Sequence, residues 1–316
     1  MSGVTVVVPA LGPSAHLERA LAALDAALAP RGESDEVVVV DDSGAGDLAG
    51  WVAERLPEAR VVARETNGGF ARAAHDGVRA ARRDVLFLMN SDLEPAPGFL
   101  EPLLEALADE RVFAAVPRVV RRGAGPARVE SLVRLVEREG RLAVEQPFVE
   151  RDAPARLLAA PCEVPFALGG ACLVRRADLL ALHGFDALFE PFYLEDVDLG
   201  WRARRAGRVC LFVPASLCEH ANQATIAEAA PRDLIEAAIE RNRLLFEWVH
   251  LDGEALERHV AALERALERA WLEEDRAALE PLALALERLD DVRLARLAAP
   301  PAGAFAELAR GLPTFE

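Results

Sequence analysis

Lysine is absent from this sequence of 316 residues, and all 36 of its basic residues are arginine. The phosphate-binding loop of P-loop nucleotide hydrolases needs a lysine directly after its glycines, so the absence excludes that mechanism. Acidic residues number 52 and set a net charge of -16. A surface this acidic repels phosphate backbones, and we therefore expect no nucleic-acid partner.

Cysteine is scarce as well, with no C-x-x-C pair among Cys162, Cys172, Cys210 and Cys218. Their spacing argues against a zinc knuckle and against a disulfide framework. No apolar run reaches about 18 residues, the length of a membrane-spanning helix, and no secretory signal opens the sequence. A reducing, cytoplasmic setting is the expectation that follows.

A G-x-G-x-x-G fingerprint is also missing after the first predicted strand, which disfavours a dinucleotide-binding oxidoreductase. What the sequence does contain is a series of β-branched apolar runs that alternate with stretches of helical periodicity. We expect buried strands over 4–10, 36–42, 59–64, 85–89 and 112–120. We expect helices over 14–29, 47–56, 67–83 and 97–109. This alternation predicts an α/β fold with a largely parallel sheet, in which ligands bind at the carboxyl ends of the strands.

The second part of the sequence is less regular. Residues 121–163 are rich in Arg, Glu and Pro, and we expect a hairpin or a surface excursion there. Further along the chain we expect a strand over 166–176, a helix over 195–207, a strand over 208–215 and a loop over 218–225.

The C-terminal part of the sequence carries a helical pattern without catalytic residues. A long amphipathic helix is predicted over 231–250, and the pattern continues to about 297, ahead of a proline-rich break at 300 and 301. We interpret this part as an appendage for packing or oligomerisation.

Polar side chains follow two of the predicted strands where each strand ends. Asp92, in the triplet Asn90-Ser91-Asp92, could hold Mg²⁺ or Mn²⁺ through oxygen, with Asn90 beside it. The three residue types are also good turn formers. Asp41 and Asp42 could contact the base and ribose of a nucleotide, or cap the helix near Asp47.

Two further candidates lie in the second half of the sequence. Glu195 and Asp196 stand where a helix starts, and one of them could remove a proton from an attacking hydroxyl. Acids are equally common in the first turn of an ordinary helix. His220 follows a strand, and a lone histidine is more often structural. It becomes a metal-ligand candidate if the fold brings it near Asp92.

Taken in order, these stretches resemble the family-2 glycosyltransferases of GT-A fold, in particular their bacterial rhamnosyltransferase-like branch. Each motif is weak alone, and their order makes the resemblance specific over about 4–225, with Arg241-Asn242-Arg243 continuing it. The stretches that carry it are VTVVVPA, VVVVDDSGAGD, ETNGGFARAAHDGVRAAR, VLFLMNSDLEPAPGFLEPLLEAL, GGACLVRRADLLALHGFDALFEPFYLEDVDLGWRARRAG and CEH.

The resemblance implies a three-layer α/β/α sandwich with a mostly parallel central sheet and a C-terminal helical appendage. The implied GT-A domain covers 1–225, with a nucleotide-binding half over about 1–120 and an acceptor half over about 121–225. The helical region covers 226–316. The implied activity is inverting, metal-dependent transfer of a hexosyl or rhamnosyl group from a nucleotide diphosphate sugar to a hydroxyl.

The resemblance also assigns roles to residues. Asp196 is implied as the catalytic base, with Glu195 as the reserve choice. Asp92 and His220 are implied as ligands of the Mg²⁺ or Mn²⁺ ion. The implied donor-binding residues are Pro9, Asp41, Asp42, Asn67, Gly69, Asn90, Ser91 and Asp92.

The implied partners are a UDP, dTDP or GDP sugar and a glycan or lipid-linked glycan acceptor of the cell envelope, handled in the cytoplasm or at the inner membrane face. A homodimer through the C-terminal helices is a further expectation. PALG after the first strand and Ala74-His75 depart from the family pattern. They keep open an alternative, a catalytically degenerate relative that binds nucleotide or serves as a scaffold.

Overall fold

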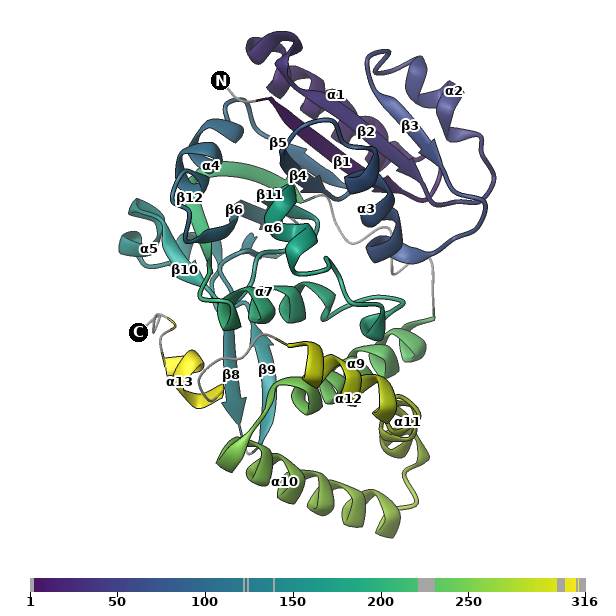
Figure 1. Cartoon of the computed structure of the whole chain (residues 1–316), viewed down its shortest axis with the longest axis vertical. Coiled ribbons are helices and arrows are strands. Elements are labelled where there is room, and N and C mark those ends of the chain that lie inside the picture. The colour runs from purple at the N-terminus through teal and green to yellow at the C-terminus, as the bar shows by residue number, and fades with distance from the viewer. Residues whose placement is uncertain are drawn as a thin grey trace.

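The computed structural model describes residues 3–121, 123, 125–138, 140–220, 231–299, 305–310 and 312. Most of its strands form one mixed sheet (Figure 1). They are β1 (Val4–Ala10), β2 (Glu36–Asp41), β3 (Arg60–Ala63), β4 (Val85–Met89), β5 (Leu93–Pro95), β6 (Val112–Arg121), β7 (Arg128–Val129), β10 (Cys162–Val164), β11 (Ala171–Arg175) and β12 (Val209–His220). A separate hairpin consists of β8 (Arg134–Arg138) and β9 (Arg141–Glu145), as the weak pattern over 121–163 allowed.

Helices lie on both faces of this sheet and at its lower end. The described α-helices are α1 (Ala15–Leu28), α2 (Leu48–Ala53), α3 (Gly69–Ala80), α4 (Leu100–Leu107), α5 (Ala155–Ala159), α6 (Arg176–Ala181), α7 (Glu195–Arg205), α9 (Arg232–His250), α10 (Gly253–Leu272), α11 (Arg276–Leu286), α12 (Leu289–Ala298) and α13 (Phe305–Arg310). Short 3₁₀ turns cover Ala29–Ser34, Glu150–Asp152 and Ala187–Phe189. None of the described helices is both long and apolar enough to cross a membrane.

The sheet order is β10-β12-β6-β11-β4-β1-β2-β3, with β5 paired to β12 and β7 paired to β6. Strands β4, β1, β2 and β3 are parallel to one another, as the alternating pattern predicts. Strand β11 is antiparallel to both of its neighbours, β4 and β6. The predicted α/β class is therefore confirmed, with a parallel first half and a mixed second half.

Alternate residues of the parallel strands face opposite helical layers. Val6 and Val8 of β1 pack in one core with α1, α2 and α4, whereas Val7 packs in a second core with α3, α7 and α9. Both cores are fully closed to solvent at these valines. The run VTVVVPA is apolar throughout because a strand between two helical layers has no face left for water.

Two predicted boundaries in the second half are wrong. The strand expected over 208–215 continues to His220, after a register irregularity between Val213 and Leu217. Proline cannot donate to a ladder, and Pro214 lies within this irregular step. Residues 218–220 are thus strand, and the rest of the expected loop, 221–225, lies outside the described residues. The strand expected over 166–176 is confined to Ala171–Arg175.

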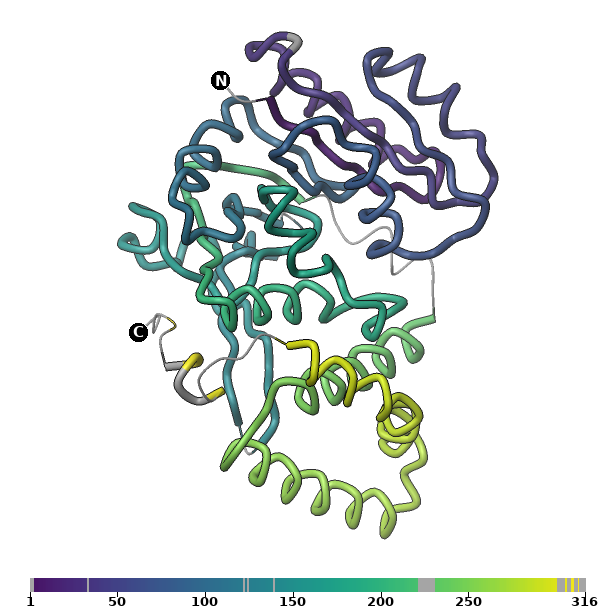
Figure 2. Tube along the Cα trace, viewed as in Figure 1, coloured from purple at the N-terminus to yellow at the C-terminus, as the bar shows by residue number. Residues whose placement is uncertain are grey.

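The C-terminal helices pack directly against α7. Trp201 of α7 is fully buried, with its ring 4.5 Å from that of Phe305 and 6.5 Å from that of Phe246. Figure 2 shows the trace of α9 to α12 gathered below α7, at the end of the molecule opposite α1 and α2. The expected boundary at 225 and 226, like the proline break at 300 and 301, lies outside the described residues.

Candidate active site

Asp92 and His220 meet where β4 ends. Asp92 is only 5% exposed, and its Oδ1 lies 3.0 Å from Nε2 of His220. The contact follows from strand pairing, because β5 continues from Asp92 and pairs with the last residues of β12, placing His220 opposite Leu93. The condition set for His220 is therefore met, since the fold brings it beside Asp92.

Glu130 completes this cluster from the other side of the imidazole. Its Oε2 lies 2.5 Å from Nδ1 of His220, and its Oε1 lies 3.0 Å from Nε of Arg121. The backbone N–H of Glu130 donates to the carbonyl of Val119, which fixes the residue beside β6. Glu130 is not among the site residues predicted from the sequence. The available signal was one carboxylate inside the apolar stretch VESLV, within a region of weak pattern.

The protonation of His220 follows from its two carboxylate neighbours. Burial alone would lower the pKa of the imidazole, but the hydrogen bonds and charges of Asp92 and Glu130 raise it to about 10. In this state both ring nitrogens carry hydrogens and donate to the carboxylates.

A divalent cation could take the place of the hydrogen on Nε2 of His220, between that nitrogen and Asp92. Among the described residues no group of three or more His, Cys, Asp or Glu side chains could by itself hold a metal. A hard cation that binds a diphosphate needs only one or two protein ligands, because phosphate oxygens and water supply the rest. Asp92 and the deprotonated Nε2 of His220 could provide two such ligands. Glu130 then accepts from Nδ1, as the carboxylate partner of a metal-bound histidine does.

Asp41 and Asp42 are both buried at the end of β2, and each holds a neighbouring loop. Asp41 accepts from the backbone N–H and the hydroxyl of Ser43, at 3.1 and 2.6 Å. Asp42 accepts from the backbone N–H groups of Gly68 and Gly69, at 2.9 and 2.8 Å, and pairs with Arg64 at 2.7 Å. The strand-end acids therefore shape the loops that border this edge of the sheet.

Asn67 and Gly69 lie at the start of α3. The side-chain oxygen of Asn67 accepts from the N–H of Gly69, which has a φ of +79°. A Cβ at Gly69 would lie 3.0 Å from the carbonyl oxygen of Pro191, so glycine permits both the backbone angle and the close approach. Residue 69 thus faces the loop that precedes α7.

Strand β1 lies between β2 and β4, and therefore between the polar residues at the ends of those two strands. Pro9 is buried near its carboxyl end, opposite Val40 of β2. Asn90 and Ser91 are half-buried at the end of β4, on the other side of β1. Strands in a sheet lie about 4.8 Å apart, so roughly 10 Å separates the end of β2 from that of β4.

Asp196 lies in the first turn of α7, over the glycine pair Gly169-Gly170. Its Oδ2 accepts from the backbone N–H of Gly169 at 3.2 Å, and its Oδ1 accepts from that of Val197 at 2.8 Å. The Asn90 side chain occupies the space that a Cβ at Gly170 would need, and the Asn90 N–H donates to the Gly170 carbonyl. One glycine pair therefore touches both the end of β4 and the acidic pair of α7.

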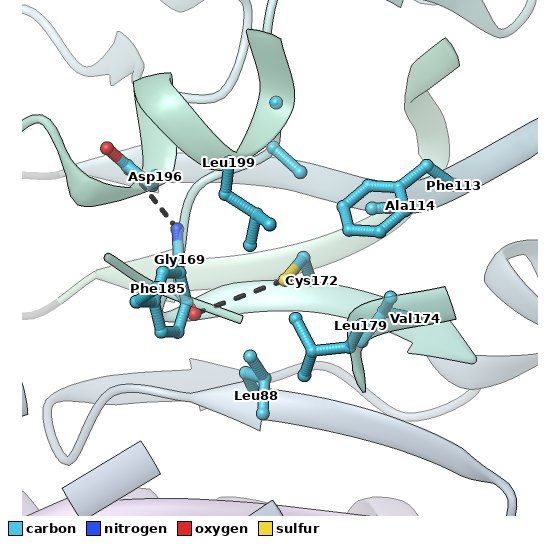
Figure 3. Close-up of a pocket in the computed structure, with 12 residues that line it drawn as sticks. Leu88, Phe113, Ala114, Gly169, Cys172, Val174, Leu179, Phe185, Asp196 and Leu199 are labelled. Carbon is cyan, nitrogen blue, oxygen red and sulfur yellow. Dashed lines mark hydrogen bonds between the residues drawn. The ribbon is translucent and has the colours of Figure 1, made fainter. Parts of the chain in front are cut away.

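An apolar layer underlies Asp196. A small cavity of about 10 Å³ lies there, with Leu88, Cys172, Phe185 and Leu199 among its lining residues. Figure 3 shows Asp196 bonded to Gly169 above these side chains. Little on this side of the carboxylate can solvate a charge except the two backbone N–H groups.

Burial raises the pKa of both acidic side chains, but their surroundings differ. For Glu195 the second cause is the nearby charge of Asp196, and its Oε2 is buried without a hydrogen-bond partner in the part of the chain that the structure describes. For Asp196 the backbone N–H groups of Gly169 and Val197 act against burial and favour the carboxylate. Of the two acids, Asp196 is therefore the one whose ionised form its surroundings favour more.

His75 belongs to Ala74-His75, one of the two places where the sequence departs from the family pattern, and it has a structural role. Its Nε2 accepts a hydrogen bond of 3.1 Å from the backbone N–H of Phe185, and burial lowers its pKa, so the ring is neutral. A Cβ at Gly184 would lie 2.2 Å from that nitrogen. His75 therefore holds the turn ahead of the 3₁₀ segment Ala187–Phe189 and is not itself part of the acidic cluster.

Comparison with known proteins agrees with this geometry. The model of glycosyl transferase family 2 matches residues 5–180. An N-acetylglucosaminyl-diphospho-decaprenol L-rhamnosyltransferase of Mycobacterium tuberculosis is 30% identical over 238 residues, covering 68% of this chain and 75% of the relative.

Two solved structures share the fold. GalNAc-T7 with UDP, GalNAc and Mn²⁺ superposes with a TM-score of 0.65 at 17% identity, covering 98% of this chain and 56% of that one. The mannosyltransferase PcManGT of Pyrobaculum calidifontis, in complex with GDP-Man and Mn²⁺, gives a TM-score of 0.52 at 20% identity, covering 94% of this chain and 85% of that one. The expected GT-A fold is confirmed.

Proposed function

The chain belongs to glycosyltransferase family 2, and from this premise we propose that it transfers a sugar from a nucleotide diphosphate sugar to an acceptor hydroxyl with inversion. The observation that carries the proposal is the glycine pair Gly169-Gly170. Asn90, at the end of β4, donates to the carbonyl of Gly170, and the carboxylate of Asp196 accepts from the N–H of Gly169. This contact supports a site in which the leaving group and the nucleophile are activated side by side.

Asp196 is the proposed base. It accepts the proton of the acceptor hydroxyl as that oxygen forms a bond to the anomeric carbon. The bond from this carbon to the donor phosphate breaks on the opposite side, which inverts the configuration. The apolar layer beneath Asp196 makes the carboxylate a stronger base than an exposed aspartate, while two backbone N–H groups keep it ionised. Glu195 is the reserve choice.

Asp92 and His220 are the residues that would hold Mg²⁺ or Mn²⁺, with Glu130 orienting the imidazole. When bound, the ion would offset the charge that develops on the departing nucleoside diphosphate. The Mn²⁺ named with both solved structures supports this proposal.

Donor binding is proposed for the strip between the ends of β2 and β4. Roughly 10 Å across three strands suits a nucleoside joined to a diphosphate. The nucleoside is assigned to the side of Asp41 and Asp42, near Asn67 and Gly69, and the diphosphate to the side of Asn90, Ser91 and Asp92. Pro9, on the strand between them, lies under the donor.

The acceptor is proposed to be a lipid-linked sugar of the cell envelope. The support is the name of the rhamnosyltransferase relative, which specifies an N-acetylglucosaminyl-diphospho-decaprenol acceptor. By the same resemblance the transferred sugar is L-rhamnose, carried on UDP, dTDP or GDP. Such an acceptor would bring the reaction to the surface of a membrane.

Calorimetric titration of UDP, dTDP and GDP, with Mn²⁺ and then with a chelator, tests the donor side. We expect one nucleotide to bind with Mn²⁺ and to lose at least about tenfold in affinity with the chelator or in Asp92→Asn. Glu94→Asn is the control, because Glu94 is a partly exposed acid two residues further on, paired with Arg19. If none of the three nucleotides binds, the protein is a degenerate relative and the proposal is wrong.

A further inference from the structure

The loop over 189–194 leads directly into Glu195 and Asp196. Tyr193 and Leu194 have φ values of +70° and +72°, a left-handed conformation that residues with a Cβ disfavour. Two such residues in succession do not hold their shape unaided, so contacts from elsewhere must fix this loop. Since Leu194 immediately precedes α7, its conformation sets the direction in which the acidic pair points.

Asn242 of α9 makes those contacts. Its side chain is fully buried, and its Nδ2 lies 2.6 Å from the carbonyl oxygen of Phe189, 3.0 Å from that of Phe192 and 2.9 Å from that of Tyr193. An amide has two hydrogens, so the three carbonyls share them. One side chain thereby joins both ends of the loop.

Arg241 fixes the orientation of this amide. Its Nε and Nη2 donate to the Asn242 Oδ1 at 2.9 and 2.7 Å, and its Nη2 also donates to the carbonyl of Glu190. Because donors face the oxygen and carbonyls face the nitrogen, only one of the two amide orientations satisfies the network.

The opposite side of the loop rests on the donor-side helix α3. Arg72 holds the Glu190 carboxylate with two hydrogen bonds of 2.6 Å, and Gly69 lies under the carbonyl of Pro191. The loop therefore lies between α3 and α9, and Asn242 is its buried attachment. The Arg72 contact is solvent-exposed and contributes less.

We propose that Asn242 is a positioning residue for the transfer reaction: by holding the backbone carbonyls of the 189–194 loop, it aims Glu195 and Asp196 at the acceptor. The inference rests on the proposed function, because Asp196 is the group that it positions. Asn242 is fully buried and acts through the loop. Helix α9, which carries Asn242, therefore contributes to the acceptor site.

Asn242→Asp is the principal test, because it keeps the shape and replaces the donor with an oxygen that repels three carbonyls. We expect kcat to fall at least about tenfold, while the affinity for the nucleoside diphosphate stays within about twofold. Tyr193 is the only tyrosine of the chain, so a protein labelled at tyrosine gives one NMR signal from this loop. That signal should shift in Asn242→Asp. Asn242→Ala should show the same pattern, and Arg241→Ala a weaker one.

Glu247→Ala is the matched control. Glu247 is equally buried on the same helix, but it accepts from the backbone N–H of Leu142 in the hairpin. We expect it to lower the melting temperature without changing kcat or the tyrosine signal. The proposal is overturned if the Asn242 and Arg241 variants behave like this control. Asp196→Asn, measured in parallel, distinguishes the positioning role of Asn242 from the base role of Asp196. Full activity in that variant would show that Asp196 is not the base, whatever the result for Asn242.

Discussion

The buried carboxylates at the strand ends differ from those of α7 in how well they are compensated. Asp42 has a guanidinium and two backbone N–H groups, and Asp92 has an imidazole. In α7, Glu195 has a buried oxygen without a hydrogen-bond partner among the described residues, and Asp196 accepts from backbone N–H groups. The partners of the strand-end carboxylates offset their charge and stabilise the sheet edge where a charged donor would lie. A carboxylate with fewer such partners remains more basic.

Replacing Asp196, the proposed base, should have the largest effect on the rate of transfer. We expect Asp196→Asn to lower kcat by at least about a hundredfold, since a general base contributes on that scale, and to leave nucleoside diphosphate binding intact. Steady-state transfer and calorimetry give the two quantities. Asp186→Asn is the control: this half-buried acid caps the turn at Leu188, and asparagine can do the same. Normal turnover in Asp196→Asn would transfer the role to Glu195 or elsewhere.

A substitution beside His220 and Asp92, at the strand ends, should have a smaller effect. We expect Glu130→Gln to reduce Mn²⁺ affinity by about tenfold, because a carboxylate behind a metal-bound histidine contributes on this scale. Titration of Mn²⁺ in the presence of nucleoside diphosphate measures it directly. Glu145→Gln, an acid of the hairpin paired with Arg134, should change nothing. Equal Mn²⁺ affinities for wild type and Glu130→Gln would show that Glu130 is only structural.

The smallest expected effect is on the pH dependence of stability. The folded pKa of Glu195 is raised, chiefly by burial, so the folded state holds a proton that the unfolded state releases above its ordinary pKa of about 4.3. Stability should therefore fall as pH rises from that value through the folded pKa. Glu195→Gln should flatten this fall, as followed by urea unfolding at several pH values.

Glu36 supplies the opposite sign as a control. Burial would raise its pKa, but Thr5, the Arg82 backbone N–H and Arg60 together lower it. Its contribution is present above the unfolded pKa and is lost as pH falls through the folded pKa. Glu36→Gln should therefore remove a loss of stability at acid pH. Similar slopes for wild type and Glu195→Gln would mean that Glu195 is no less compensated than the strand-end acids.

The sequence predicted the carboxylates at the strand ends better than the surroundings of the carboxylates in α7. The apolar runs before Asp41 and Asn90 identify buried parallel strands, and polar residues at their ends follow from the fold class. The pairing of β5 with β12, which places His220, depends on contacts 128 residues apart. Glu130 and Asn242 act only through tertiary contacts, which no local periodicity records. The antiparallel insertion of β11 was missed for the same reason, because an apolar run does not reveal its direction.

Chimeric enzymes provide a practical measure of how α7 is attached. Asp198, two residues beyond Asp196, is buried against His250 of α9 at 2.8 Å and against Arg202 at 2.7 Å. Together with the Asn242 contacts, this contact attaches α9 both to α7 and to the loop ahead of it. Exchanging the C-terminal helices of two family members at a single junction would break both. A productive exchange has to move residues 189–205 and 232–250 together, which a junction ahead of residue 189 achieves.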